Sequence, residues 1–237
     1  MDCLILRFDA PLMSFGAVVV DQINPIWRFP GTSMLAGLVG NAFGWSHADT
    51  ERLQALQERL YFSARWDAEP EALTEYQTVD LGQGHLVDTG WTTRGEREDR
   101  EGGTAKKATH QRWRSYWANG IATLAVALNS QNKPQLDAIE GALRAPARPL
   151  FLGRKPCVPA GPILIGRRQD SGVKAALQAE PLADIGCRCR PGRIKALWPL
   201  AEGPGHQEDE RFDLRDWTRN IHRSSRRYAV GFLEVGS

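Results

Sequence analysis

The stretch WRFPGTSMLAGLVGNAFGW, residues 27–45, constrains the fold of this chain more than any other. Pro30 and Gly31 interrupt the incoming backbone, and Thr32 or Ser33 can then cap a helix. Apolar residues recur after that point at helical spacing: Met34, Leu35, Leu38, Val39, Ala42 and Phe43. The pattern predicts a helix with one face packed on a core.

Three glycines in this predicted helix, Gly37, Gly40 and Gly44, require an explanation. Each costs a helix about 0.5–1 kcal/mol relative to alanine, so something must come close to the backbone there. The first turn lacks an acidic side chain that would complement the helix dipole, and Arg28 stands just before it. Two interpretations stay open: a core helix packed tightly on a sheet, or a helix start that binds a nucleic-acid phosphate.

Composition sets wide limits on function. The 237 residues are enough for one large domain or two small ones, and a formal net charge of +2 neither demands nor excludes a polyanionic partner. The four cysteines are too few and too scattered for a disulfide scaffold, so we expect reduced thiols. Cys187 and Cys189 lack a second ligand pair at zinc spacing, and a zinc site completed by His206 is the weakest alternative. We therefore expect no metal and no cofactor.

Targeting signals are the next consideration. The N-terminus enters a strand-like apolar run at residues 3–8 without a basic segment and long apolar stretch before it, and no later segment approaches the length of a membrane span. We expect a cytoplasmic protein without a membrane partner.

The first half of the chain predicts strand, helix and strand, followed by an insertion. Asp49 or Thr50 can cap a second helix, and strands are expected at 61–67 and 73–81. Residues 82–109 are then rich in glycine and charge, and structureless loops longer than about 12–15 residues are uncommon in compact domains unless functional or disordered. This segment is a candidate binding arm, and a solvated charged loop is the alternative.

A strand over 109–117 would place basic and aromatic residues on one face, namely His110, Arg112, Arg114 and Tyr116. Asn119-Gly120 predicts a type I′ hairpin turn that returns the chain as an apolar strand over 121–128. A further helix is expected to start near Pro134 and to end before Pro146.

The remaining chain offers two charged patterns. Gly153 followed by Arg154 and Lys155 suits close approach of a phosphate, although alone the motif is weak. GPGHQEDE, residues 203–210, is expected to be an exposed loop, and a closing strand is expected at 227–233. Between them, four arginines at fourfold spacing predict a shared face on a helix or strand, for which a solvated surface is the favoured interpretation: Arg211, Arg215, Arg219 and Arg223.

The order strand, helix, strand, strand, helix, then a glycine-rich loop and a strand is the ferredoxin-like, or RRM-like, plan, so the fold class is α+β with an antiparallel sheet. Three stretches resemble the CasD (Cas-five) family of the type I-E CRISPR effector Cascade: PLMSFG at 11–16, RFPGTSMLAGLVGNAFG at 28–44 and PLFLGRKPCVP at 149–159. The resemblance implies a RAMP domain over 1–166 with a thumb hairpin inserted at about 82–109. A small β-rich C-terminal extension, 167–237, would pack on it.

The resemblance also implies a function. Such a subunit would hold the five-prime handle of the guide RNA and cap the filament of backbone subunits, with the large subunit and target DNA near the complex as further partners. The candidate RNA-binding residues carried over or drawn from basic clusters are Ser14, Phe15, Gly16, Arg28, Thr32, Ser33, Arg94, Lys106, Lys107, His110, Arg112, Arg114, Gly153, Arg154, Lys155, Arg226 and Arg227.

A metal-independent endoribonuclease that processes CRISPR precursor RNA is the alternative, since relatives in type I-C systems cut that RNA. His110, Tyr116, Lys106 and Lys107 supply the side-chain types that general acid-base catalysis needs. The catalytic relatives also use a tyrosine near the first helix, and residues 28–45 contain neither tyrosine nor histidine. We therefore expect a binding subunit without catalytic residues.

Overall fold

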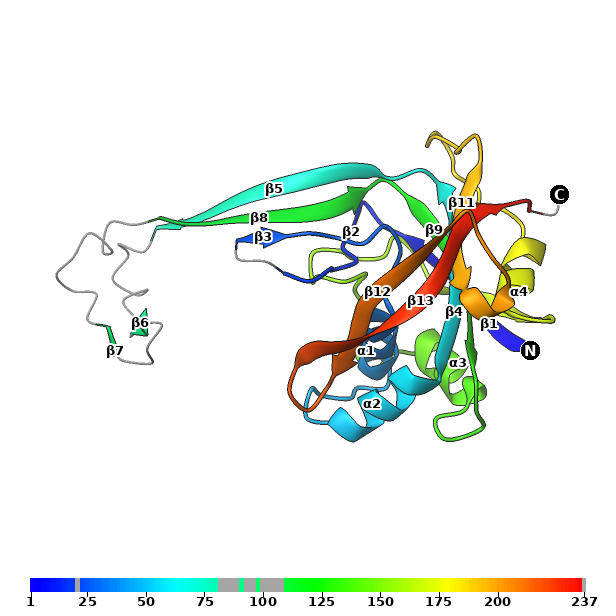
Figure 1. Cartoon of the computed structure of the whole chain (residues 1–237), viewed down its shortest axis with the longest axis horizontal. Helices are drawn as coiled ribbons and strands as arrows, with labels where there is room; N and C mark the ends of the chain where they lie inside the picture. Colours follow the sequence, from blue (N-terminus) through cyan, green and yellow to red (C-terminus); the bar gives the residue numbers. More distant parts are fainter. Residues whose placement is uncertain (20–21, 81–89, 92–96, 99–108, 236–237) are drawn as a thin grey trace.

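The computed structural model describes residues 1–19, 22–80, 90–91, 97–98 and 109–235, and it shows a mixed α+β architecture built on an antiparallel sheet (Figure 1). Seven strands lie in the spatial order β10-β1-β9-β4-β11-β13-β12, and each neighbouring pair is antiparallel. The strands are β1 (Asp2–Asp9), β4 (Leu60–Ala68), β9 (Ile121–Leu128), β10 (Leu164–Gln169), β11 (Ile194–Pro199), β12 (Gln207–Asp216) and β13 (Ile221–Leu233).

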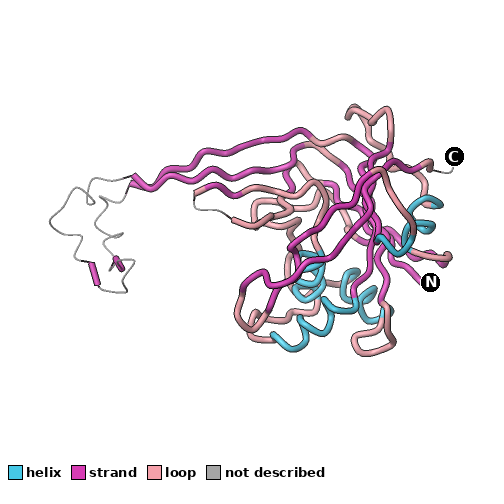
Figure 2. The backbone as a smooth tube through the Cα atoms, viewed as in Figure 1, coloured by secondary structure: helices cyan, strands magenta, loops and turns pink. Residues whose placement is uncertain are grey.

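Alternating side chains of β1 divide the core into two layers. Leu4, Leu6 and Phe8 belong to the layer shared with the first three helices, whereas Cys3 and Ile5 pack with the fourth helix on the other face. The helices are α1 (Thr32–Ala42), α2 (Thr50–Arg59), α3 (Leu136–Arg144) and α4 (Val173–Ala179), with a short 3-10 turn η3 (Leu200–Glu202). Figure 2 shows these helices gathered in the body of the molecule, away from a long strand pair that projects from it.

Most predicted elements of the first 166 residues are confirmed. Helix α1 begins at Thr32, α2 follows Asp49 at its N-cap, and α3 ends before Pro146. The predicted boundary between 166 and 167 falls inside β10, and β11, β12 and β13 continue the same sheet. No described helix is long and apolar enough to cross a membrane.

The projecting strand pair belongs to a second sheet. This sheet contains β2 (Leu12–Met13), β3 (Ile23–Asn24), β5 (Glu71–Asp80) and β8 (Thr109–Ala118). β5 and β8 pair along ten residues and extend together from the body, as Figure 1 shows. Two short strands, β6 (Gly90–Trp91) and β7 (Arg97–Glu98), pair with each other. The predicted arm at 82–109 otherwise falls almost entirely on residues outside the described set.

The hairpin predicted at Asn119-Gly120 is wrong. β8 pairs with β5 while β9 pairs with β1 and β4, so the two segments continue one strand path from the projecting pair into the main sheet. Asn119 has a φ of 58°, but Gly120 is not in the positive-φ region that a type I′ turn requires. A Cβ on Gly120 would come within 2.7 Å of both Trp66 and Pro70. The glycine therefore allows close packing at a bend.

The C-terminal sequence also differs from its prediction. Gln207 to Glu210, expected in a loop, begin strand β12, which pairs with β13. Arg211 is 1% exposed and donates hydrogen bonds to Asp209 at 2.8 Å and to the carbonyl of Phe29 at 3.0 Å. The fourfold arginine pattern is therefore not one solvated face, because its first member is a buried structural residue.

Candidate nucleic-acid interface

A groove of about 480 Å³ lies where the segment after β2, the exposed side of α1, the loop after α3 and the β12–β13 pair meet. Six predicted binding residues line it: Ser14, Gly16, Ser33, Gly153, Arg154 and Lys155. Three stretches far apart in the sequence are thus brought together. No spacing in the sequence indicates that these stretches meet.

Gly153 is positioned by direct contact with the segment after β2. Its φ is +104°, and a Cβ would lie 1.8 Å from the carbonyl oxygen of Ser14. The amide of Ser14 donates to the carbonyl of Leu152 at 2.9 Å, which fixes the loop against that segment. The Ser14 side chain is 2% exposed, and its hydroxyl has no hydrogen-bond partner among the described residues. Gly153 and the segment that carries Ser14 therefore form one closely packed wall of the groove.

Arg154 is oriented by β8. Its guanidinium lies 5.0 Å from the centroid of the Tyr116 ring and donates to the carbonyl of Ser115 at 3.2 Å. Tyr116 is buried and its hydroxyl donates to Glu75 at 3.1 Å, so this phenol is engaged inside the protein. Lys155, which follows Arg154, is exposed.

The predicted phosphate site at the start of α1 requires a correction. Gly31 is the N-cap, and the amide of the fully buried Thr32 donates to the carboxylate of Asp213. The Thr32 hydroxyl shares a hydrogen bond of 2.9 Å with the hydroxyl of Tyr228. A carboxylate of the protein itself therefore occupies the positive end of the helix dipole, and Thr32 is not accessible to RNA.

Two opposing effects act on this capping carboxylate. Burial raises the pKa of Asp213, while the hydrogen bond from Thr32 and the nearby charge of Arg211 lower it, and the net direction is upward. Burial together with the neighbouring Asp213 raises the pKa of the Tyr228 phenol. Both groups belong to the interior of the fold.

Two other candidates also serve the fold. The Phe15 ring is 1% exposed and packs with Trp66 at a centroid distance of 6.0 Å, so it is not available to stack on a base. Arg28 pairs with Glu69, and its guanidinium lies 5.8 Å from the centroid of Trp117. Neither residue lines the groove.

The candidates on the closing strand divide between the interior and the surface. Arg226 donates to the carbonyls of Leu60 at 2.6 Å and Gln57 at 3.1 Å, and it thereby satisfies carbonyls at the end of α2. Arg227 is exposed and lies 3.6 Å from Glu208. Arg226 is thus a structural residue.

The two described arginines of β8 that were predicted to bind RNA are not part of the groove lining. Arg112 is exposed and Arg114 is half-buried on β8, and neither is among the described residues that line the groove. Arg94, Lys106 and Lys107 lie outside the described residues, and so does the side chain of His110. Their predicted contacts stay predictions.

The groove lining also includes Trp45, His47, Arg148, Arg215 and His222. Arg148 donates to the carbonyl of Trp45 at 3.0 Å, and the Arg215 guanidinium lies 5.2 Å from the Trp217 ring. Burial and the charge of Arg215 lower the pKa of His222. Only Arg215 had a sequence signal, as a member of the fourfold arginine pattern.

The charged side chains on the described lining of the groove are positive. Its described lining contains four permanent cations, contributed by Arg148, Arg154, Lys155 and Arg215, and no aspartate or glutamate. Two indoles and two imidazoles lie among them. Cations along a track with aromatic rings between them are the chemistry by which proteins hold single-stranded nucleic acid.

Comparison with known proteins identifies the family. A family model described as CRISPR-associated protein (Cas_Cas5) matches residues 3–232, so the chain belongs to the Cas5 family. The CRISPR system Cascade subunit CasD of Escherichia coli (strain K12) is 33% identical over 184 residues, which cover 76% of this chain and 77% of that protein.

Two solved structures have a similar fold. A chain of a CRISPR RNA-guided surveillance complex superposes with a TM-score of 0.70 at 25% identity, covering 98% of this chain and 90% of the other. A crystal structure of a Cas protein has a TM-score of 0.59 at 19% identity, with 98% and 95% covered, and supports the fold alone.

Proposed function

We propose that this chain is a non-catalytic subunit of a type I-E Cascade surveillance complex, in which the groove holds the five-prime handle of the guide RNA. One observation carries the proposal: the stretches that resemble the family converge on a groove with four cations and no described carboxylate. The similarity to CasD and to a chain of an RNA-guided complex supports the same assignment.

The fold supports the finer architectural part of the proposal. The spatial order β10-β1-β9-β4 corresponds to the order four, one, three, two of a βαββαβ unit, with α1 and α2 in the first crossover and α3 in the second. We infer a ferredoxin-like RAMP domain, with the β5–β8 pair as the base of a thumb hairpin. In the complex, this hairpin reaches the neighbouring backbone subunit and the chain caps the filament.

A salt titration tests the groove directly. Arg148 and Lys155 changed together to Ala should weaken binding of guide RNA that carries the handle, and should reduce the slope of log affinity against log salt by about 1.4, at about 0.7 per lost phosphate contact on a single strand. Arg144 and Arg168 changed together to Ala are the matched control, because they pair with Glu140 and Glu180 outside the groove. Unchanged affinity and slope in the groove variant would refute the proposal.

The catalytic alternative has its own test. We expect the wild-type protein to leave guide precursor uncut in the presence of a chelator. Specific cutting at the repeat that disappears in His110→Ala would instead favour the endoribonuclease, since loss of a general acid or base lowers a rate by about 10²–10⁴-fold. In that case RNA affinity of His110→Ala should be nearly that of the parent.

A further inference from the structure

One buried side chain of α2 fixes the far end of the β12–β13 pair. Gln57 is 1% exposed, and its amide group bonds both backbone polar groups of Arg215: it donates to the carbonyl at 2.9 Å and accepts from the N–H at 3.1 Å. The same side-chain oxygen accepts from the indole Nε1 of Trp217 at 3.1 Å. Because β12 is the outer strand of the sheet, Gln57 supplies here the hydrogen bonds that a further strand would give. The backbone of Arg215 and the ring of Trp217 are therefore fixed together.

The side chain of Arg215 is held as well as its backbone. Its guanidinium lies 5.2 Å from the centroid of the Trp217 ring and donates to the side-chain oxygen of Asn220. A guanidinium has five N–H donors, so others remain for a ligand. A long side chain that is ordered before binding loses less conformational entropy when the ligand arrives. Arg215 is thus a preorganised donor on the wall of the groove.

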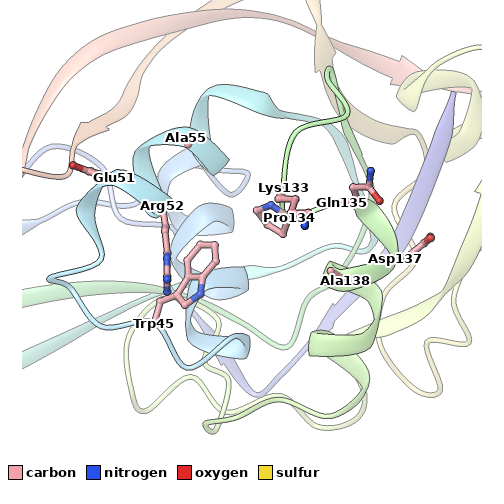
Figure 3. Close-up of a pocket in the computed structure, with 9 residues that line it drawn as sticks. All are labelled: Trp45, Glu51, Arg52, Ala55, Lys133, Pro134, Gln135, Asp137 and Ala138. Atoms are coloured by element: carbon pink, nitrogen blue, oxygen red, sulfur yellow. The ribbon is translucent and has the colours of Figure 1, made fainter.

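The positive charge of Arg215 lacks an acidic partner. No aspartate or glutamate among the described residues forms an ion pair with it, and burial lowers the pKa of its guanidinium. Arg52 provides the contrast. Its guanidinium also lies near an indole, 6.0 Å from the centroid of Trp45 as Figure 3 shows beside α2, but it pairs with Asp49 at 3.3 Å. A partly desolvated cation without a counterion attracts an anion more strongly than one that is already paired.

A second donor stands opposite Arg215. His222 is its partner across the β12–β13 ladder, so the two side chains lie on the same face, and both line the groove. Opposite residues start about 4.5–5.5 Å apart at Cβ, a separation that suits two donors on one phosphate. An imidazole carries at least one N–H in either protonation state. The pair therefore offers donors from two strands to one anion.

We propose that Arg215 and His222 together grip one phosphate of the guide RNA and so set the register of the strand in the groove, with Gln57 as the positioning residue. The inference rests on the proposed function, because the groove must hold the RNA. Arg148 and Lys155 are exposed and supply general attraction for the strand. A phosphate bound by a fixed guanidinium has a defined position instead.

Arginine variants test the grip. Arg215→Ala should weaken binding of guide RNA that carries the handle by about tenfold, and should reduce the slope of log affinity against log salt by about 0.7. Arg215→Lys keeps the charge without the planar fork, so it should keep the slope and recover only part of the affinity. Arg52→Ala is the matched control, since it removes an arginine from an indole outside the groove lining, and it should bind nearly as the parent does.

Neutral linkages in the RNA locate the phosphate. A methylphosphonate placed in turn at each position of the handle should cost the parent about tenfold at one position, and should cost Arg215→Ala little there because the contact is already lost. In Gln57→Met that cost should shrink too, whereas a variant that only loses stability keeps the parent's positional profile. Gln54→Met, on the same helix with its amide bonded to Glu58 at 2.8 Å, is the control and should keep the profile.

The outcomes separate this inference from the proposed function. If Arg148 and Lys155 do not affect RNA binding, the groove assignment fails and the phosphate grip fails with it. If they do, but Arg215→Ala responds to every neutral linkage as the parent does, the phosphate grip alone is overturned. A sensitive linkage that depends on Arg215 but not on Gln57 would overturn the positioning role of Gln57.

Discussion

The start of α1 and the glycine loop at Gly153 have the same sequence chemistry and opposite environments. Both place backbone amides next to a cation, which is a pattern typical of phosphate sites. At α1 the amide of Thr32 meets the carboxylate of Asp213, whereas Gly153 lies beside two cations at an open groove. Anion-binding geometry is therefore common to both, and only one of them is available to a ligand.

A distant part of the chain decides whether such an anion site is open to a ligand. Asp213 stands 181 residues from Thr32 along the chain, so nothing near α1 in the sequence reveals the internal anion. A Cβ on Gly31 would come within 2.8 Å of the Asp213 carboxylate, so even the glycine before the helix serves this contact.

The largest effect should come from Gly153→Ala. Alanine at a φ of +104° is strained, and its Cβ would overlap the carbonyl oxygen of Ser14, so we expect a loss of about 2–4 kcal/mol in the free energy of unfolding. Guide RNA affinity should fall as well. Gly161→Ala is the control from the same loop, since its Cβ would meet nothing within 4 Å. Equal denaturation midpoints for the two variants would contradict this account.

Asp213→Ala should destabilise the fold without weakening RNA binding. Removal of the carboxylate leaves the buried Thr32 amide unsatisfied, which costs about 1–3 kcal/mol. Asp213→Asn retains an oxygen that can accept this hydrogen bond and should lose less. Denaturant unfolding measures the first effect and RNA titration the second. A loss of RNA affinity as large as that of the groove variants would break the contrast between the two regions.

Ser33→Asp should show the reverse behaviour. Ser33 follows Thr32 but lines the groove, and an acidic residue in the first turn of α1 suits the helix dipole. We expect stability within about 1 kcal/mol of the parent and about a tenfold loss of RNA affinity from repulsion of the phosphates. Ser33→Asn adds similar bulk without charge and should bind nearly as the parent does. If Ser33→Asp binds guide RNA as tightly as the parent, the α1 side of the groove is not part of the RNA interface.

The smallest effect should be a pH dependence from His222. Its pKa is lowered in the free protein by burial and by Arg215, so the imidazole is mostly neutral near its ordinary pKa. A bound phosphate favours the imidazolium and raises this pKa, so the complex takes up a proton and affinity rises as the pH falls. We expect a gain of about two- to fivefold between about pH 7.5 and about pH 5.5. His222→Gln should reduce the gain, and His206→Gln, outside the groove, should not.

Local patterns in the sequence predicted most of the helices and strands in the first 166 residues. The apolar spacing of residues 34–43 located α1, and capping and proline positions located α2 and α3. The hairpin prediction at Asn119-Gly120 is wrong because local sequence does not determine which strands pair. β8 pairs with β5, and β9 pairs with β4. The loop prediction for residues 207–210 is wrong because these residues begin β12. This strand lies at the edge of the sheet, where charged side chains stay in solvent.

The candidate site was predictable only in part. Gly153 and the two cations after it had a readable pattern, since a glycine followed by positive charge suits a phosphate. His47, Arg148 and His222 come from three separate segments, and no spacing in the sequence indicates that they meet. Conversely, Arg226 sits in a basic run but is used to bind carbonyls at the end of α2. Tertiary structure decides which cations stay free to contact a ligand.

The pairing of β4 with β11 affects how the chain folds while it is being synthesised. Before β11 emerges, the edge of β4 opposite β9 lacks its strand neighbour, and before β12 emerges, Thr32 lacks its carboxylate partner. A nascent chain on the ribosome therefore carries an open sheet edge and an unfinished helix end, both of which favour contact with other chains or with chaperones. Arrival of the final strands closes the sheet and completes the helix whose first turn borders the groove.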